Sequence, residues 1–387
     1  MHTDIVVIGN GMFGSAALRH LAERGHTVVG VGAGETLNNG EAQPPHRVYS
    51  SHNDEARLTR RQDRNAAWAQ VTGRAVSNYR ELERRSGISF FHDVGCLIAS
   101  RPGGDGVSPD PRVVMDETGV DFTLYPPGDA AWRNTWPSLA FPDTHFVAHE
   151  PTPAGYLRPK RLIQAQNVLA SNAGAQHITD TVVDVVQTAT GFCVHTAEEL
   201  HITCTRVLVA AGAFSNFNNL LPSPIDVTVK SEVIVLGEVT PADAAQLGKY
   251  PTVKFMNDPG DLESIYMVPP VQYPDGCYYI KMGANTTHDV FFTRLEDVQR
   301  WFETDPDQVF LAMFEAQLRA LWPDVAFTSV HTAPCVITRT PTSAPLIEHV
   351  ANGLFITTAG NGGGAKGSDA WGELAADVIE AYQRNQV

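Results

Sequence analysis

The chain begins with an apolar stretch and a glycine turn, Ile5-Val6-Val7-Ile8-Gly9-Asn10-Gly11-Met12-Phe13-Gly14. This order predicts a buried strand, a G-x-G-x-x-G turn, a helix over residues 15–24 and a second strand from Thr27. In such a unit the glycines allow a tight turn, bring the backbone close to a pyrophosphate and let the helix pack closely on the strand. The helix N-terminus also stabilises the phosphate charge. We therefore predict a dinucleotide site built from Gly9, Gly11, Met12, Phe13 and Gly14, with an ordinary glycine turn as the alternative.

One element of the dinucleotide motif is missing. The end of the second strand normally holds an acid that binds the ribose hydroxyls, and here that position is Gly32. Glu35 lies three residues later and reaches the ribose only if the loop bends back. Glu35 is therefore the candidate for ribose recognition, and whether it replaces the missing acid stays open.

The composition of the 387-residue chain limits the classes of binding partner that the protein can have. It holds 28 Lys and Arg against 43 Asp and Glu, a net charge of −15, which disfavours binding to nucleic acid and to anionic membrane surfaces. The start of the chain has no basic segment before a long apolar one, and no stretch is long enough to span a bilayer. We therefore expect no signal peptide and a cytoplasmic protein. The length suggests two interlocked domains.

Neither the cysteines nor the histidines form a recognisable metal or disulfide framework. The five cysteines are scattered without a C-x-x-C pair, so any functional cysteine is expected to act alone. His145 and His149 are four residues apart, but the residues between them are predicted to be extended and no third ligand has a fitting spacing. We expect no metal ion.

Outward from the glycine turn, apolar periodicity predicts further elements. We interpret the inward face of the next helix as core rather than as a binding surface, and its stripe consists of Trp68, Val71, Ala75, Tyr79 and Leu82. A loop-rich region over 101–145, a helix over 157–173 and strands near 181–186, 191–194 and 207–213 follow.

Residues 226–330 have a different character. They are β-rich, with strands near 227–239, 264–268 and 277–282, and a helical stretch covers 295–321. We interpret this region as a second domain that is built on an antiparallel sheet.

A second glycine loop lies near the C-terminus. The strand 354–358 ends in Ala359-Gly360-Asn361-Gly362-Gly363-Gly364-Ala365-Lys366, and a last helix follows, with Ser368 as the expected N-cap and with Trp371, Leu374, Val378 and Tyr382 facing inward. Two helix N-termini in one domain offer one site for a pyrophosphate and another for a second electron-rich group. A flavin ring becomes anionic on reduction and would be stabilised by the second terminus. A flavin is therefore favoured over a nicotinamide, and a glycine-rich surface turn is the alternative.

Six segments of the chain resemble one flavoenzyme family in their order and spacing. They are residues 9–14, 51–60, 207–212, 278–283, 334–335 and 362–366. Together they resemble the monomeric sarcosine oxidase and N-methyl-amino-acid oxidase group of the D-amino-acid-oxidase-like flavoenzymes.

The resemblance implies an α/β fold with two interwoven domains, and we expect a monomer. One is a Rossmann-like FAD-binding domain of the glutathione-reductase type, and the other is an α+β substrate domain built on an antiparallel sheet. Accordingly, we assign residues 1–88, 146–222 and 330–387 to the FAD-binding domain and residues 89–145 and 223–329 to the substrate domain.

The same resemblance implies how FAD is held. Taken alone, Cys335 is typical of a buried thiol. The resemblance makes it the cysteine that carries FAD through a thioether to the flavin 8-methyl group, an 8α-S-cysteinyl link. Further cofactor-binding residues are expected to be Ser51, His52, Arg57, Gly212, Gly362, Gly363, Gly364 and Lys366.

The resemblance assigns three basic residues to the chemistry. Lys281 by itself is typical of a solvent-facing lysine, but the resemblance places it over the flavin, where a fixed positive charge helps O2 to accept an electron. Arg60 and Lys366 are placed at the substrate carboxylate as a bidentate fork and a point charge, although an arginine-rich segment alone is typical of a solvated surface. The implied reaction oxidises an amino or imino acid to an imine and reduces O2 to H2O2. No side chain is an obvious strong base, so we expect hydrogen transfer directly to FAD.

The sequence departs from the family at two substrate-site positions. Met267 stands where sarcosine oxidases have a tyrosine and Asn285 where they have a histidine, and the loop 360–366 is one residue shorter. The departures put sarcosine itself in question as the substrate, and a larger or cyclic secondary amino acid is also a candidate. Three alternatives stay open: a cyclic imino-acid oxidase or desaturase of specialised metabolism, an amino-acid dehydrogenase that uses another electron acceptor, and a NAD-binding module without chemistry of its own.

Overall fold

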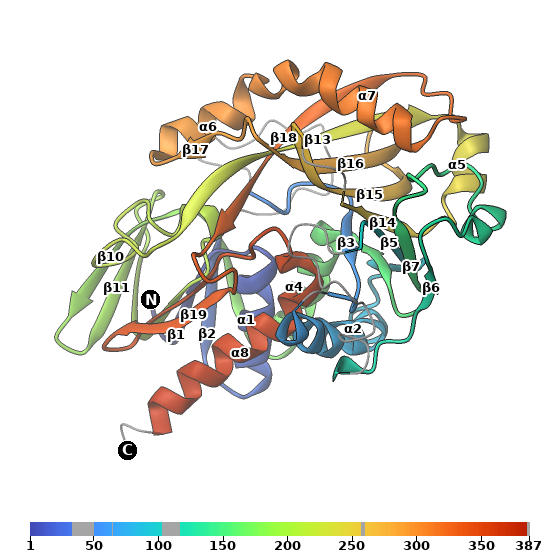
Figure 1. Ribbon diagram of the computed structural model, residues 1–387. Helices are drawn as coiled ribbons and strands as arrows, with labels where there is room; N and C mark the ends of the chain where they lie inside the picture. The colour runs from blue at the N-terminus through green and yellow to red at the C-terminus, as the bar shows by residue number, and fades with distance from the viewer. Residues whose placement is uncertain (33–49, 64, 103–116, 257–259, 385–387) are drawn as a thin grey trace.

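The computed structural model describes residues 1–32, 50–63, 65–102, 117–256 and 260–384, so Glu35 lies outside the described residues. Two large sheets dominate the molecule, with helices α1, α2, α4 and α8 beside the first and α6 and α7 across the outer face of the second (Figure 1). The predicted α/β class with a second, largely antiparallel sheet is confirmed.

The first sheet has eight strands, and its centre is parallel. β1 pairs in parallel with β2 and β12, β2 pairs with β9, and β12 pairs with β20. Parallel strands of this kind are apolar on both sides because both faces of the sheet are covered, and Ile5–Ile8 are accordingly buried. The strands are β1 (His2–Ile8), β2 (Val28–Gly32), β9 (Gln176–Thr179), β10 (Val182–Thr188), β11 (Gly191–Thr196), β12 (His201–Val209), β19 (Leu346–Ala351) and β20 (Leu354–Thr358).

Four helices pack beside this sheet: α1 (Met12–Glu23), α2 (Ala66–Ser86), α4 (Pro159–Asn172) and α8 (Gly364–Arg384). The structure corrects the start of α8, which begins inside the glycine loop, so Ser368 is a buried residue within the helix rather than its N-cap. The fully buried residues of this helix include Ala375, Ala376 and Ile379. Of the predicted inward residues, Trp371, Leu374, Val378 and Tyr382 are partly buried, and Val378 and Tyr382 pack against the core.

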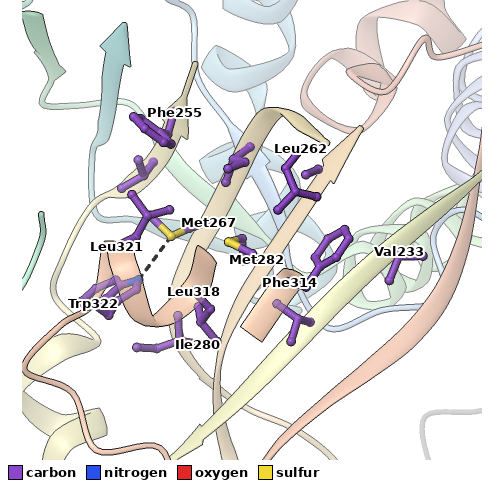
Figure 2. Close-up of a cluster of buried hydrophobic side chains, with 14 of the residues drawn as sticks. Val233, Phe255, Leu262, Met267, Ile280, Met282, Phe314, Leu318, Leu321 and Trp322 are labelled. Atoms are coloured by element: carbon purple, nitrogen blue, oxygen red, sulfur yellow. Dashed lines mark hydrogen bonds between the residues drawn. The ribbon is translucent and has the colours of Figure 1, made fainter. Parts of the chain in front are cut away.

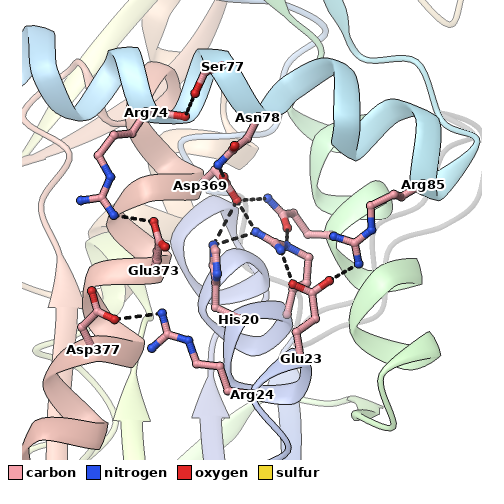
Figure 3. Close-up of polar contacts among 12 residues, drawn as sticks. His20, Glu23, Arg24, Arg74, Ser77, Asn78, Arg85, Asp369, Glu373 and Asp377 are labelled. Atoms are coloured by element: carbon pink, nitrogen blue, oxygen red, sulfur yellow. Dashed lines mark hydrogen bonds and ion pairs between the residues drawn. The ribbon is translucent and has the colours of Figure 1, made fainter.

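A buried aspartate joins these four helices. Asp369 of α8 accepts hydrogen bonds from Arg19 Nη2 of α1 at 2.7 Å, Gln166 Nε2 of α4 at 2.9 Å and Asn78 Nδ2 of α2 at 3.2 Å (Figure 3). Its side chain is fully buried. A buried carboxylate is stable only with such partners, so Asp369 fixes how the four helices are placed relative to one another.

The second sheet has nine strands, and every printed pairing except β14 with β5 is antiparallel. The predicted division into domains places β7 and β18 in the FAD-binding domain. In the structure β7 pairs with β5 and β18 pairs with β13, so both strands belong to this second sheet. The strands are β5 (Cys96–Ser100), β6 (Thr123–Tyr125), β7 (Phe146–Glu150), β13 (Thr228–Val239), β14 (Thr252–Phe255), β15 (Leu262–Gln272), β16 (Tyr278–Thr286), β17 (Phe291–Phe292) and β18 (Val330–Arg339).

The outer face of the second sheet forms a large hydrophobic core with the helices above it. Phe314, Leu318 and Leu321 of α7 pack on Met267 and Met282, which are opposite each other in the sheet (Figure 2). The helical stretch predicted over 295–321 is broken into α6 (Leu295–Glu303), the 3-10 helix η3 (Pro306–Phe310) and α7 (Leu311–Leu321). Pro306 explains the break, because a proline cannot donate the backbone hydrogen bond that a continuing helix needs.

Smaller elements complete the fold. β3 (Arg57–Thr59) and β4 (Phe91–Asp93) pair with β8 (Gly155–Leu157), and the remaining pieces are α5 (Pro241–Leu247) and the 3-10 helices η1 (Ala131–Asn134) and η2 (Gly212–Phe214). Of the helices in the described part of the chain, none is long and apolar enough to cross a membrane.

Candidate active site

A cavity of about 780 Å³ is enclosed by both sheets and the segments that connect them. Its walls include the N-terminal glycine turn, residues 50–63, the start of η2, the C-terminal glycine loop and the inner face of the second sheet. These segments are far apart in the sequence, and they contain most of the predicted site residues. Gly9, Gly11, Met12, Phe13, Ser51, His52, Arg57, Arg60, Gly212, Asn285, Cys335, Gly362, Gly363, Gly364 and Lys366 all line the cavity.

The N-terminal glycine turn fits a dinucleotide. Gly14 does not line the cavity but allows close packing, because a Cβ at this position would lie 1.9 Å from the carbonyl oxygen of Gly9. At the missing acid position, a Cβ on Gly32 would lie 2.5 Å from the backbone nitrogen of Asn10, so Asn10 occupies that space. Asn10 Oδ1 is buried and has no hydrogen-bond partner in the described part of the chain. It is an acceptor that a hydroxyl or amino group of a bound nucleotide would satisfy.

The C-terminal glycine loop brings a second helix N-terminus to the same cavity. Ala359, Asn361 and Gly362 all have positive φ angles, of 63°, 49° and 76°, and the loop turns directly into α8 at Gly364. The starts of α1 and α8 therefore both open on one cavity. Two such termini suit a ligand with a pyrophosphate and a second electron-rich group.

Arg57 and Cys335 lie together on one wall. Arg57 Nη2 donates to the carbonyl oxygen of Ser51 at 2.5 Å and lies 3.6 Å from Cys335 Sγ. Burial raises the pKa of the Cys335 thiol, and the positive charge of Arg57 opposes that rise. Cys335 is 6% exposed and faces the cavity, so it is accessible to a ligand bound there.

Lys281 lies behind the cavity wall rather than on its surface. Its ammonium group donates to the carboxylate of Asp54 and to the carbonyl oxygen of Ala56 at 2.7 Å. It also lies 5.3 Å from the ring centroid of Tyr266, which does line the cavity. Burial and the nearby charge of Arg57 lower the pKa of Lys281 to about 8, although Asp54 opposes this shift.

Arg60 and Lys366 line the cavity together and share one carboxylate. Lys366 Nζ donates to Asp63, and Arg60 Nη2 lies 3.7 Å from the same oxygen of Asp63. Although burial has the opposite effect, the charges of Lys366 and Arg60 lower the pKa of Asp63 to about 2. Arg60 Nε is buried without a hydrogen-bond partner among the described residues, so the pair has a donor left for a bound anion.

Trp68 does not belong to the helix core as predicted. It is half-buried, it lines the cavity, and its ring centroid lies 5.2 Å from Lys366 Nζ. The stripe on α2 is core only at Ala75, Tyr79 and Leu82, with Val71 packed partly against it. Trp68 lies in the first turn of α2, beyond the end of that core, so it packs over the glycine loop instead.

The structure places the two departures from the family differently. Asn285 lines the cavity and accepts a hydrogen bond from Arg339 Nη2 at 2.8 Å. Met267 does not reach the cavity: it is 1% exposed, and Trp322 Nε1 points at its sulfur from 3.3 Å. Side chains alternate along a strand, so Met267 faces the core with Met282, while the neighbouring Tyr266 faces the cavity.

Several residues in or beside the cavity were missed in the sequence, and Asp54, Asp63 and Glu232 are among them. Asp54 and Asp63 lie beside the arginines of the segment 51–63, and an acid three residues from an arginine was the available signal. Glu232 also lines the cavity, opposite Cys335 in the pairing of β13 with β18. Glu232 follows Lys230 and Ser231 in β13, and this pattern did not indicate that the Glu232 side chain faces a site.

The histidines considered as metal ligands have other partners. His145 Nε2 lies 2.9 Å from the carbonyl oxygen of Met256, and the ring of His149 packs on Trp136. Among the described residues, no group of three metal-ligating side chains could hold an ion.

The cavity lies between a parallel sheet, which brings two helix N-termini to it, and a second sheet, which carries charged side chains. This is the architecture of a nucleotide-dependent enzyme in which a separate wall binds the substrate. The comparisons agree: the chain belongs to the DAO family of FAD dependent oxidoreductases, which it matches over residues 4–378. It is therefore an FAD-dependent oxidoreductase.

Two kinds of relative illustrate this membership. A monomeric sarcosine oxidase from Streptomyces avermitilis is 26% identical over 385 residues, covering 97% of this chain and 93% of that protein. Among solved structures, NikD, an unusual amino acid oxidase essential for nikkomycin biosynthesis, has a TM-score of 0.75 at 19% identity, covering 98% of this chain and 94% of NikD. L-proline dehydrogenase from P. horikoshii has a TM-score of 0.74 at 20% identity over 98% and 94% of the two chains. The structural likeness shows that the fold is shared.

Proposed function

We propose that this protein oxidises the C–N bond of a secondary amino acid, N-alkyl or cyclic, to an imine and reduces O2 to H2O2. The observation that carries the proposal is the arrangement of Arg60 and Lys366 at the cavity. The two positive side chains share a single carboxylate, that of Asp63, and the buried Nε of Arg60 has no hydrogen-bond partner among the described residues. That arrangement has the charge and the geometry to bind one carboxylate. Curated relatives named sarcosine oxidase and N-methyl-L-tryptophan oxidase support an N-alkyl amino acid.

FAD, when bound, supplies the two-electron acceptor for this oxidation. The starts of α1 and α8 would hold its charged groups, and Cys335 would carry it through a thioether, with Arg57 next to the sulfur. Asn10 Oδ1 is our candidate for a hydrogen bond to the nucleotide, in addition to Glu35.

The residues of the chain then position the substrate. Arg60 and Lys366 fix the carboxylate, and Tyr266 and Asn285 shape the wall that the amine substituent faces. Lys281 and Arg57 keep positive charge beside the cavity, which favours the reduction of oxygen. The buried acid Glu232, whose pKa is raised by burial, also faces the cavity.

A second candidate is a dehydrogenase that passes electrons to another acceptor. The observation that favours it is that Lys281 lies behind Tyr266 and is paired with Asp54, so it does not itself line the cavity. Likeness to L-proline dehydrogenase is a likeness of fold alone. The two candidates differ in whether peroxide is formed.

The substrate and the acceptor can be tested together. We expect a screen that detects peroxide to respond to N-alkyl or cyclic amino acids and not to the matching amines that lack the carboxylate. Because a charge-assisted hydrogen bond contributes about 1.5–3 kcal/mol, Arg60→Gln should raise KM roughly 10- to 100-fold for the same substrate. Oxidation of the decarboxylated amine at an equal rate would contradict the carboxylate site, and turnover with a dye but without peroxide would favour the dehydrogenase.

The covalent link has a direct test. We expect the yellow colour to stay with the polypeptide after denaturation in acid, and to be released from the Cys335→Ala variant. Cys277→Ala is the matched control, because Cys277 does not line the cavity, and it should keep the colour. Release of the flavin from the unmodified protein would exclude the thioether.

A further inference from the structure

The two lysines of the site are each paired with an aspartate from one short segment. Lys281 Nζ donates to Asp54, and Lys366 Nζ donates to Asp63. All four side chains are at most 12% exposed. An ammonium group in such surroundings is stable only when it is paired.

Asp54 is held as a carboxylate by four donors. They are Lys281 Nζ, Arg57 Nη1, the hydroxyl of Tyr273 at 2.7 Å and the backbone nitrogen of Glu55 at 2.7 Å. Other titratable groups that face Lys281 are Arg57, Tyr266 and Cys335. Among these neighbours, Asp54 is the one that is both in contact with the ammonium group and negatively charged.

Asp63 has the same relation to Lys366. One of its oxygens accepts from the backbone nitrogen of Asn65 at 3.2 Å, and the other faces Lys366 Nζ and Arg60. Other charged or titratable groups near Lys366 are Arg60, Glu150 and Cys96. Glu150 accepts from the backbone nitrogens of Arg61 and Gln62 at 2.8 and 2.7 Å, which fixes the segment that carries Asp63.

Burial and arginine charges act against both ammonium groups. Burial, with the charge of Arg57, lowers the pKa of Lys281 to about 8, and burial lowers the pKa of Lys366, with Arg60 adding to the effect. Asp54 and Asp63 oppose these shifts. The ammonium form of each lysine is therefore stabilised by the carboxylate of its aspartate.

We propose that Asp54 and Asp63 are positioning residues that keep Lys281 and Lys366 protonated, one for each half of the reaction. The inference rests on the proposed function, in which Lys281 acts on oxygen and Lys366 binds the substrate carboxylate. Asp54 then sets the pH range of the reaction with O2, and Asp63 sets the pH range of carboxylate binding. One segment, residues 54–63, thereby controls the pH dependence of the reaction with O2 and of carboxylate binding through two different residues.

The experiment compares Asp54→Asn and Asp63→Asn in the flavin-loaded protein. Reoxidation by O2 is followed by stopped flow across pH, and binding of acetate is followed through the flavin absorbance. In the unmodified protein, reoxidation should slow as the pH rises through about 8, because Lys281 loses its proton. Asp54→Asn should move this midpoint down by about one unit or more, which makes reoxidation about fivefold or more slower at pH 8, while acetate binding stays unchanged. Asp63→Asn should move the loss of acetate binding with rising pH to a lower pH than in the unmodified protein, and it should leave reoxidation unchanged.

Glu55→Gln is the matched control on the same segment. Glu55 pairs with Lys160 at 3.6 Å and does not line the cavity, so neither half should change. A measurement without turnover completes the design: the 13Cε NMR resonance that disappears in Lys281→Arg reports the titration of Lys281 and should shift to lower pH in Asp54→Asn.

Three results would overturn the inference. One is a pH profile of reoxidation that is unchanged in Asp54→Asn. Another is tighter acetate binding in Asp63→Asn at every pH, which would mean that Asp63 competes with the substrate. A third is an equal effect of both variants on both halves, which would indicate a general structural change.

Three lysine variants keep the test decisive. If an Asn variant does not fold, Lys281→Arg and Lys366→Arg should each remove the pH dependence of one half, because arginine keeps its charge; a pH dependence that persists would contradict the proposal. Lys281→Met should reoxidise slowly. Normal reoxidation of this variant would refute the oxygen role of Lys281 itself, and with it the Asp54 half, whereas acetate binding would still test Asp63.

Discussion

Tyr266 and Met267 are adjacent in β15 and face opposite sides of the second sheet. Tyr266 lies in the cavity wall beneath Lys281, and Met267 lies among the side chains of α7. The sequence around them, Ile265 to Val268, is apolar apart from the tyrosine hydroxyl, so the alternation of the two faces leaves no clear pattern. When a residue's role is inferred from a family resemblance, the register of its strand must therefore be known before its side chain can be assigned to the cavity or to the core.

Met267→Ala tests this placement. Removing a fully buried methionine leaves a cavity in the core, so we expect the free energy of unfolding to fall by about 2–5 kcal/mol in urea denaturation, with acetate binding unchanged. Tyr266→Ala is the comparison variant, and it should alter substrate KM more than stability. A change of substrate preference in Met267→Ala without loss of stability would contradict the assignment to the core.

At the scale of elements, the start of α8 determines the surroundings of a functional residue. Because the helix begins at Gly364, Lys366 lies in its first turn, where the helix dipole disfavours a positive charge. Asp63, from the loop before α2, supplies the compensating charge. The glycine loop therefore brings a helix N-terminus and a lysine to the same point of the cavity. Because the helix dipole disfavours the charge of this lysine, a carboxylate from elsewhere in the chain is needed to stabilise it.

The whole molecule depends on joining segments that are distant in sequence. The first sheet takes strands from the beginning, middle and end of the chain, and the four helices beside it meet at Asp369 (Figure 3). His20 adds to this network, with its Nε2 3.4 Å from Asp369. Although burial opposes it, the hydrogen bond and charges of His20 and Arg19 hold the pKa of Asp369 well below its usual range.

Asp369→Asn should therefore destabilise the protein in a pH-dependent way. Breaking a buried charge network costs about 3–5 kcal/mol, and we expect this loss in denaturation at neutral pH. Because the folded pKa is depressed, the stabilisation is present above the unfolded pKa of about 3.9 and is lost as the pH falls further. The difference between variant and unmodified protein should shrink below about pH 4.

The control for this prediction is Glu373→Gln on the same helix. Its carboxylate pairs with Arg74 at 2.6 Å on a half-exposed surface, so the loss should stay below about 1 kcal/mol. A loss as large as that of Asp369→Asn, or an Asp369→Asn effect that does not change with pH, would contradict the role of the buried network.

The turns, the helix termini and the fold class of this protein could be predicted from the sequence alone. The glycine turn, the second glycine loop and the α/β class follow from short-range patterns, because turns and helix termini depend on neighbouring residues. The same segments indicated the FAD-dependent family to which the chain belongs. They also supplied the residues that now line one cavity, apart from Gly14, Met267 and Lys281, with Glu35 outside the described residues.

Only the tertiary structure showed which carboxylates pair with the lysines of the site. Asp54 and Lys281 are 227 residues apart, and Asp63 and Lys366 are 303 apart, so no spacing in the sequence connects them. The boundary strands β7 and β18 likewise joined the second sheet because of pairing with distant strands. Local sequence thus determined which cations the site contains, and long-range packing determined how buried they are and which carboxylates hold their charge.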